Sequence, residues 1–335
     1  MDLPTSLAPL SEVFWRGHSP AIAADSSPHA ITVVTAFFDL GRAQWRAPDA
    51  SPSPFQRGVD RYFERFAHLA KLENDMVVFV APDHAARVLA IRREAGLAER
   101  TTIVTIAGLF DREPIATVEA ETRKRMTPRF HRWVLQPQMP EYREPRYILI
   151  NALKAAFVGA ALDLGLVRDS QTAWIDFGYC GDDKRFDAAK PWRFDAGDKM
   201  NLFHVTALDI LPIYRVVRYG TVYFQGCHIV GPNAAWPAFA REMSFCLAAL
   251  LAVDLIDDDQ TLQLMAWRRN PGAYRIHGVS PKDWRIIFKR FNLDVPLENV
   301  EPPKARRARE ESTMREELRI QMKRWEWWFK KTFRS

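Results

Sequence analysis

The sequence predicts an α/β fold in which helices flank a central, mostly parallel mixed sheet. Three short apolar runs alternate with two amphipathic stretches between residues 30 and 106. The first run, AITVVTAFF at Ala30–Phe38, is apolar or β-branched on both faces, which is typical of a central strand. A second observation is the apolar run Ala173–Ile175, which ends in Asp176. Strand, helix, strand, helix, strand at this spacing indicates right-handed parallel connections.

The period of the apolar residues gives the elements of the first half. Strands are expected at Ala30–Phe38, Met76–Val80 and Thr101–Ile106, and helices at Phe55–Leu72 and Asp83–Glu94. The stretch Pro114–Pro145 has five prolines and no steady period. We interpret it as a lobe inserted over the sheet.

The second half continues with a helix that feeds the strand ending in Asp176. The expected elements are a helix at Tyr147–Leu166, a polar connector at Asp182–Asp198, a hairpin of two strands at Ile213–Val217 and Thr221–Val230, and a helix at Ala234–Val253. Residues 1–30 are expected to be an irregular lead-in, and residues 31–300 the folded domain.

Residues 301–335 are expected to form a basic amphipathic helix. Lys304–Ser335 holds 11 Lys/Arg and 5 Asp/Glu, whereas the rest of the chain holds 36 of each sign. Two interpretations of the apolar stripe in this helix stay open: it packs on the body or on another subunit, or residues 310–335 bind an anionic membrane surface. Nucleic acid is not expected as a partner, because clustered Trp on an apolar face suits lipid or protein better than a phosphate backbone.

Cysteine usage and the apolar runs indicate the compartment. The three cysteines have no CxxC or paired His spacing, which argues against a disulfide framework or a structural zinc site. The N-terminus carries Asp2 where a signal peptide has positive charge, and no apolar stretch reaches the roughly 18 to 20 residues of a membrane span. We expect a cytoplasmic protein, either free or peripheral on the inner face of the plasma membrane.

Four places in the sequence could carry chemistry. Asp176 stands at the carboxyl end of a buried strand, where open α/β sheets bind their ligands. Asp258, Asp259 and Gln260 open a helix; the structural alternative is a run of capping acids. His277, Gly278 and Lys282 could supply a metal ligand, a close backbone approach and a phosphate-binding cation, although a lone His near a turn is usually structural. Gly226 interrupts a strand and suggests a bulge or a close ligand approach.

Three motifs resemble the bacterial HtrL/YibB family, also called WlaTC/HtrL. They are VTAFFDLGRAQW at Val34–Trp45, ENDMVVF at Glu73–Phe79 and WIDFGYC at Trp174–Cys180. The family is found with genes for surface polysaccharides and is regarded as related to the GT-A glycosyltransferases. The resemblance covers most of residues 31–290 and implies a GT-A-like fold for the domain at 31–300.

The GT-A resemblance implies roles for individual residues. In those enzymes a strand ends in a DxD motif whose acids hold a divalent metal; Asp176 matches the first acid, and Gly178 stands in place of the second. HGVSPKDW at His277–Trp284 is similar to a late motif that gives a metal-binding His and a phosphate-binding Lys, here His277 and Lys282 with Gly278 beside them. Asp258, Asp259 and Gln260 are similar to a motif near the acceptor sugar.

The donor is expected to meet two further segments. Asn151 and Lys154 lie in the helix that precedes the DxD-like motif and would lie near the donor. The donor base would lie against the end of the first strand, at Thr35, Ala36, Phe37 and Asp39, although Phe37 could equally be plain core.

Together these features predict a hexosyltransferase-type glycosyltransferase. The expected donor is a nucleotide-sugar, a UDP-sugar in the first instance, and the acceptor a glycan or glycolipid precursor of cell-surface polysaccharide or lipopolysaccharide. Manganese or magnesium at Asp176 and His277 would stabilise the leaving diphosphate. Asp258 or Asp259 would act near the anomeric carbon or as general base. The alternative is a catalytically inactive GT-A-like glycan-binding or assembly protein.

Overall fold

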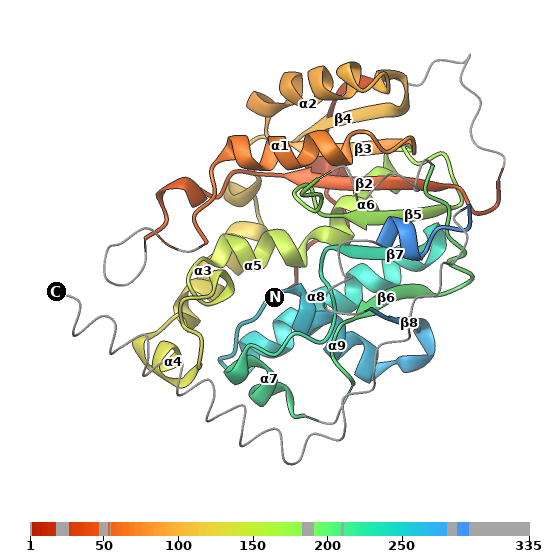
Figure 1. Cartoon of the computed structure of the whole chain (residues 1–335). Helices are drawn as coiled ribbons and strands as arrows, with labels where there is room; N and C mark the ends of the chain where they lie inside the picture. The colour runs from red at the N-terminus through yellow and green to blue at the C-terminus, as the bar shows by residue number, and fades with distance from the viewer. Residues whose placement is uncertain are drawn as a thin grey trace.

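One eight-stranded sheet organises the part of the chain that the structure describes. The computed structural model describes residues 2–17, 27–46, 53, 55–182, 191–208, 211–279 and 287–294. The strand order is β1-β4-β3-β2-β5-β7-β6-β8 (Figure 1). The strands are β1 (Glu12–Arg16), β2 (Ile31–Phe37), β3 (Met76–Val80), β4 (Thr101–Thr105), β5 (Gln171–Ile175), β6 (Met200–His204), β7 (His228–Pro232) and β8 (Tyr274–Gly278).

Helices cover both faces of this sheet. They are α1 (Val59–Leu69), α2 (Pro82–Glu94), α3 (Ile115–Arg125), α4 (Pro128–Trp133), α5 (Pro145–Ala152), α6 (Lys154–Asp163), α7 (Ile213–Tyr219), α8 (Trp236–Ala252), α9 (Asp259–Arg269) and α10 (Ile287–Arg290). The sheet is parallel from β4 through β3 and β2 to β5, and again between β6 and β8. It is antiparallel at β1, and β7 runs antiparallel to both of its neighbours. The predicted mostly parallel mixed sheet flanked by helices is confirmed.

Alternate residues of the central strands supply two separate cores. In β2, Val33 belongs to the core that contains Phe66 of α1, whereas its neighbour Val34 belongs to the core that contains Phe157 of α6. Trp174 of β5 lies on the same side as Val34, stacked on Phe157 with ring centroids 5.7 Å apart. Because both faces are buried, the central strands read as continuous apolar runs, and this is why the sequence revealed them.

The predicted hairpin at Ile213–Val217 and Thr221–Val230 is wrong at its first strand. Residues Ile213–Tyr219 form helix α7, and the strand that follows, β7, begins only at His228. Pro212 precedes the helix, and Gly220 ends it in the left-handed conformation with φ 59°. Val216 and Val217 are buried on one side of α7, so burial on a helical face outweighs the β-propensity of valine.

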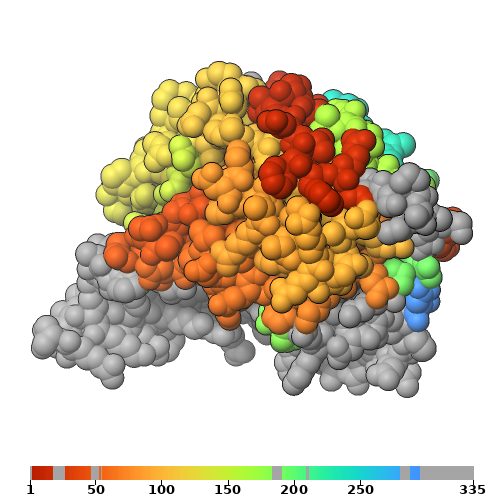
Figure 2. Space-filling view, turned by 90° about the horizontal axis from the view of Figure 1, so that it is seen from above, coloured from red at the N-terminus to blue at the C-terminus, as the bar shows by residue number. Residues whose placement is uncertain are grey.

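The expectation of an irregular lead-in over residues 1–30 also needs correction. Residues Glu12–Arg16 form β1, which pairs antiparallel with β4 at one edge of the sheet. Val13 and Phe14 are exposed, so β1 lacks the alternation of buried and exposed residues by which a strand is recognised. Figure 2 shows the N-terminal segment, in red, against the orange elements that include α2. Trp15 of β1 contacts α2, because the Arg93 guanidinium carbon lies over the Trp15 ring, 4.9 Å from the ring centroid.

One helix and two strands also differ from the prediction. The helix expected over Tyr147–Leu166 is divided into α5 and α6 by Leu153, so Lys154 opens a new helix. The strands β6 and β8 were not expected, because their sequences MNLFH and YRIHG mix polar and apolar residues without a clear period. The helix expected over residues 301–335 lies outside the described residues.

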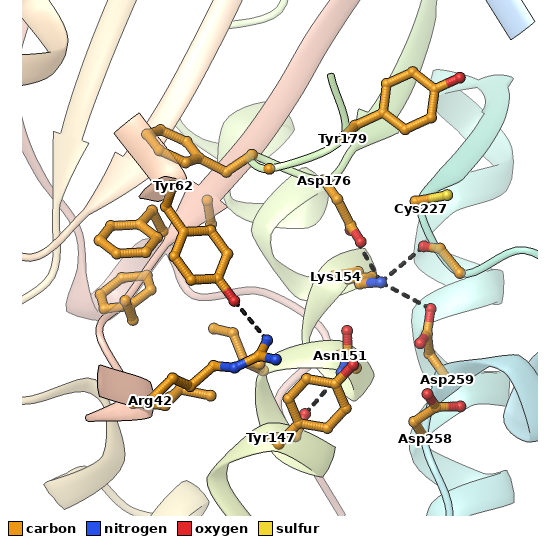
Figure 3. Close-up of a pocket in the computed structure, with 18 of the residues that line it drawn as sticks. Arg42, Tyr62, Tyr147, Asn151, Lys154, Asp176, Tyr179, Cys227, Asp258 and Asp259 are labelled. Carbon is orange, nitrogen blue, oxygen red and sulfur yellow. Dashed lines mark hydrogen bonds and ion pairs between the residues drawn. The ribbon is translucent and has the colours of Figure 1, made fainter. Parts of the chain in front are cut away.

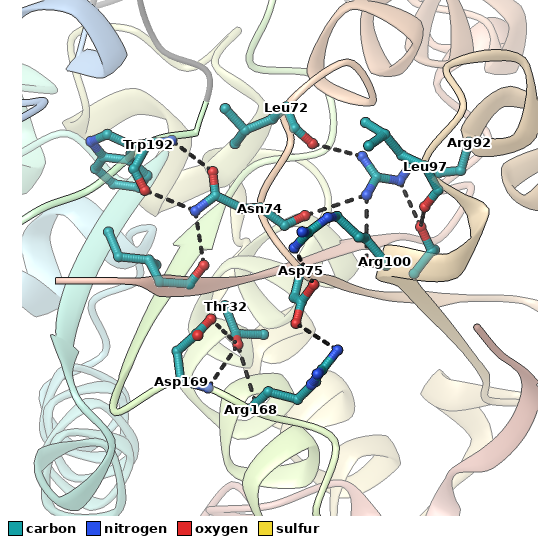
Figure 4. A network of polar contacts seen from close by, with 12 residues as sticks. Thr32, Leu72, Asn74, Asp75, Arg92, Leu97, Arg100, Arg168, Asp169 and Trp192 are labelled. Carbon is teal, nitrogen blue, oxygen red and sulfur yellow. Dashed lines mark hydrogen bonds and ion pairs between the residues drawn. The ribbon is translucent and has the colours of Figure 1, made fainter. Parts of the chain in front are cut away.

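The two ends of the parallel strands carry different polar clusters. The carboxyl ends of β2 and β5 border a pocket whose side chains are drawn in Figure 3. Their amino ends border a network of polar contacts that joins loops to the sheet, drawn in Figure 4. Within that network Asn74 donates to the carbonyl oxygens of Ile31 (2.9 Å) and Trp192 (2.8 Å) and accepts from the Trp192 backbone N–H.

Arg92 of α2 is the most buried charge of this network. Its side chain has no exposed surface, and its guanidinium donates to the carbonyl oxygens of Ala70 (2.7 Å) and Leu72 (2.9 Å) and to the Thr101 hydroxyl (2.7 Å). Burial lowers the pKa of Arg92 to about 9, against the opposing charge of Asp75. The hydrogen bonds of Arg92 thus connect the loop after α1 and the start of β4 to α2.

None of the helices in the described ranges combines the length and the apolar character that a membrane crossing requires.

Replacing Arg92 with Met is expected to lower the free energy of unfolding by about 2–4 kcal/mol, because buried carbonyl oxygens lose their donors. Urea denaturation measures the change. Arg61→Met is the control, since Arg61 is exposed and pairs with Glu64 on the surface; it should cost less than about 1 kcal/mol. Equal midpoints for the two variants would contradict the structural role of Arg92.

Candidate functional site

A polar pocket of about 310 Å³ opens at the carboxyl ends of β2 and β5. This is where open α/β sheets place their ligands, because the loops diverge there. Figure 3 shows its side chains coming from α1, α5 and α6, from the loop before β7 and from the start of α9. The pocket has two kinds of polar wall, one built around Lys154 and carboxylates, the other built from arginines.

Lys154 lies at the centre of the first wall. Its ammonium nitrogen is 2.7 Å from the carbonyl oxygen of Gly226, 3.0 Å from Asp259 Oδ2 and 3.0 Å from Asp176 Oδ1 (Figure 3). An ammonium group has three N–H donors, so these three oxygens use all of them. Burial lowers the pKa of Lys154, but the two carboxylates outweigh burial and raise it above its ordinary value. Lys154 is therefore a permanent cation.

Asp176 is placed at the pocket by the end of β5. Its backbone N–H donates to the Cys227 carbonyl oxygen at 3.1 Å, and Trp174 Nε1 donates to its Oδ1 at 2.8 Å. The Asp176 side chain is 36% exposed, whereas that of Asp259 is 2% exposed. Both carboxylates line the pocket, and Asp176 is the more exposed of the two.

The Tyr62 ring leaves little room for a side chain at position 178. A Cβ at Gly178 would lie 3.0 Å and 3.3 Å from two ring carbons of Tyr62, and the Gly178 carbonyl oxygen accepts from Arg65 at 3.2 Å. A side chain two residues after Asp176 would need the Tyr62 ring to shift by a few tenths of an ångström. The Tyr62 ring thus packs closely against position 178, where the GT-A resemblance would expect a second acid.

The start of α9 supplies the remaining carboxylates. Asp258 caps the helix by accepting from the Gln260 N–H at 3.1 Å, as the structural alternative predicted, and it also lines the pocket with Asp259 and Gln260. Burial, and then the charge of Asp259, raises the pKa of Asp258 well above its usual range. Burial also raises the pKa of nearby Glu141 to about 8, helped by the charge of Asp257.

The second wall consists of three arginines that sequence reasoning missed. Arg42, Arg57 and Arg65 line the pocket opposite the carboxylates, around the Tyr62 ring. Arg42 is 8% exposed; it donates twice to the Phe55 carbonyl oxygen and, at 2.5 Å, to the Tyr62 hydroxyl. Arg57 lies over the Tyr62 ring, 5.4 Å from its centroid. Arg42 falls inside the motif at Val34–Trp45, and that was the only sequence signal for this wall.

The other predicted donor contacts divide between pocket and core. Ala36, Phe37, Asp39 and Asn151 line the pocket, and Asn151 donates its amide to the Tyr147 carbonyl oxygen at 2.9 Å. Phe37 also stacks on Phe177 at 5.1 Å, so it is both core and pocket wall. Thr35 is fully buried in β2 and is not among the lining residues.

The structure does not bring His277 to Asp176. His277 lies in β8, which β6 and β7 separate from β5, and its Nε2 is 2.8 Å from Asn201 Oδ1. Its ring stacks on Phe203 with centroids 5.2 Å apart, and burial lowers its pKa to about 4. Gly278 ends the same strand and does not line the pocket, whereas Lys282 lies outside the described residues.

The described residues do not fit a divalent metal ion as they are arranged. No group of three His, Cys, Asp or Glu side chains capable of holding a metal occurs in the described ranges. Asp176, the acid expected to bind the metal, and Asp259 beside it both accept from Lys154. The expected manganese or magnesium therefore stays a prediction from the sequence.

The comparisons with known proteins identify the family. Residues 29–293 match the model of "Bacterial protein of unknown function (HtrL_YibB)". The chain belongs to the HtrL_YibB family. It is 32% identical over 271 residues to Protein HtrL of Escherichia coli (strain K12), an alignment that covers 78% of this chain and 92% of that protein.

Among solved structures, the inositol-1-phosphate CTP transferase from T. maritima is similar with a TM-score of 0.36 and 10% identity, over 76% of this chain and 91% of that chain. A similarity this distant does not bear on function. The HtrL_YibB match is more informative about the site, because residues 29–293 include both walls of the pocket. The tail from residue 301 lies beyond the match.

Gly226→Ala is expected to disturb the Lys154 cluster, because a Cβ there would lie 2.4–2.8 Å from the Asp259 carboxylate. Overpacking of this kind should lower the free energy of unfolding by about 1–3 kcal/mol, measured by thermal or urea denaturation. Gly272→Ala is the matched control, since its Cβ would meet only Asn270 Oδ1 at 3.7 Å. A Gly226→Ala variant as stable as this control would show that Asp259 is free to move.

Proposed function

We propose that this HtrL_YibB protein is a glycosyltransferase of the hexosyltransferase type. Its donor is a nucleotide-sugar, a UDP-sugar in the first instance, and its acceptor is a glycan or glycolipid precursor of a cell-surface polysaccharide or lipopolysaccharide. The observation that carries the proposal is the pocket with arginines on one side and carboxylates on the other, at the carboxyl edge of an α/β sheet. The GT-A resemblance of the sequence motifs supports the same function.

The arginine wall suits the charged part of such a donor. Guanidinium groups bind phosphate oxygens through paired N–H donors, and Arg57 lines the pocket with its guanidinium over the Tyr62 ring. Tyr62 and Tyr147 give the same pocket aromatic surface, on which a nucleotide base can pack. The diphosphate of the donor would thus lie toward Arg42, Arg57 and Arg65.

The carboxylate wall suits the sugar and the acceptor. In the transfer step the acceptor oxygen forms a bond to the anomeric carbon, the bond from that carbon to the donor phosphate breaks, and the nucleoside diphosphate leaves. For an inverting enzyme the acceptor hydroxyl gives its proton to a base. Asp258 is the better candidate of the two acids, because Asp259 already accepts from Lys154 and Gln263.

A second candidate is a glycan-binding or assembly protein without turnover. It is favoured by one observation: Gly178 packs against Tyr62 where the second acid of a DxD motif would stand. The two candidates differ in whether donor is hydrolysed or transferred after it binds. Attachment of residues 310–335 to the inner face of the plasma membrane would serve a lipid-linked acceptor in either case; these residues lie outside the described ranges.

Arg57→Gln is expected to weaken binding of UDP by about 10–100-fold, because it removes a charge-assisted contact to phosphate. Isothermal titration calorimetry with UDP measures the affinity. Arg61→Gln is the matched control on the exposed side of α1, two residues into the helix, and should bind UDP as the wild type does. Absence of UDP and UDP-sugar binding by the wild type, or equal affinities for the two variants, would contradict the proposed donor site.

Asp258→Asn is expected to reduce release of UDP from a UDP-sugar by about 100-fold or more, because the proton acceptor is lost. Binding of UDP itself should change little, and the helix cap should survive, since Asn caps helices as well as Asp does. Donor turnover and UDP affinity are measured on the same preparation. Turnover that Asp258→Asn leaves unchanged contradicts its role as base, and binding without turnover in the wild type favours the second candidate.

A further inference from the structure

Lys154 occupies a position whose ligands are those of a hard metal cation. Two carboxylate oxygens and one backbone carbonyl oxygen surround its ammonium group at 2.7–3.0 Å, and they come from the end of β5, the start of α9 and the loop before β7 (Figure 3). Carboxylate and carbonyl oxygens are the ligands that Mg²⁺ and Mn²⁺ prefer. In this protein a side chain of the chain itself provides the cation.

A divalent ion and the Lys154 ammonium cannot share these oxygens. A bound Mg²⁺ would approach them to about 2.1 Å, which leaves no room for an ammonium group 3 Å from the same atoms. The Lys154 side chain would have to move away, but it is only 5% exposed. Lys154 is the first residue of α6, and the next two residues, Ala155 and Ala156, are buried. A displaced ammonium group in such surroundings loses its acceptors and its hydration together.

The phosphate charge of a ligand has other partners in the same pocket. Arg42, Arg57 and Arg65 line the wall opposite Lys154, so three guanidinium groups already provide positive charge there. Arginine and lysine side chains can stabilise the charge of a phosphate group, as Mg²⁺ does.

We propose that Lys154 is the built-in cation of this site, and that the pocket binds and uses its phosphate-bearing donor without a divalent metal ion. Lys154 neutralises Asp176 and Asp259 and keeps their oxygens in place, while the arginine wall binds the diphosphate. The inference rests on the proposed function for the nature of the donor. The part of the inference that concerns metal does not depend on the proposed function, because the oxygens around Lys154 can be probed with Mn²⁺ alone.

Titration with Mn²⁺, followed by the electron paramagnetic resonance signal of the free ion, tests the Lys154 position directly. The wild type is expected to take up no Mn²⁺ at the site. Lys154→Met frees two carboxylates and is expected to gain a Mn²⁺ site. Adding Asp176→Asn to that variant should remove the gained site. Lys124→Met is the matched control, since Lys124 is 68% exposed and pairs with Glu121 on the surface. Wild-type uptake of Mn²⁺ that Asp176→Asn abolishes overturns the proposal.

A second measurement uses only the wild type, so it holds even where Lys154→Met does not fold. Affinity for UDP and release of UDP from a UDP-sugar are compared in EDTA and in added Mn²⁺, and both should differ by less than about twofold. A loss of more than about tenfold in EDTA overturns the proposal. If the wild type binds no UDP at all, the proposed function fails, while the Mn²⁺ titration still decides whether Lys154 excludes the metal.

Discussion

The salt-bridged cluster around the Lys154 ammonium is the interaction on which the site depends. It joins the end of β5, the loop before β7 and the start of α9 through Asp176, Gly226 and Asp259. Buried charges are expensive to desolvate, and this arrangement is stable because each N–H of the ammonium has an oxygen partner. Gly226 is required at its position because a Cβ would collide with the Asp259 carboxylate. The backbone at Gly226 thus leaves room for the ion pair between Lys154 and Asp259.

The polar clusters at the two ends of the parallel strands serve different purposes. At the amino ends, Arg92 and Asn74 donate hydrogen bonds to backbone carbonyl oxygens that would otherwise be buried without partners. At the carboxyl ends, Asp176, Asp258 and Arg57 keep polar groups directed at a cavity. A cluster that closes on itself stabilises the fold, whereas one that borders a cavity can bind a ligand.

Packing around Gly178 limits what can stand two residues after Asp176. Tyr62 packs where a side chain at position 178 would lie, and Arg42 and Arg57 both lie against that ring. A side chain at position 178 would press on the Tyr62 ring, and an acid there would place a negative charge beside the wall that we propose binds phosphate. The absence of a side chain at position 178 and the placement of the Tyr62 ring are therefore parts of one local packing arrangement.

The sequence by itself determined the parallel half of the sheet and the end of β5, because buried strands leave continuous apolar runs and Asp176 follows one of them directly. It also pointed to Lys154, Asp258 and Asp259 as site residues. Only the tertiary structure decided which of the candidates meet. His277 falls at the far edge because strand order is set by packing across the sheet, and three arginines enter the pocket from loops and helix faces whose direction no local period encodes.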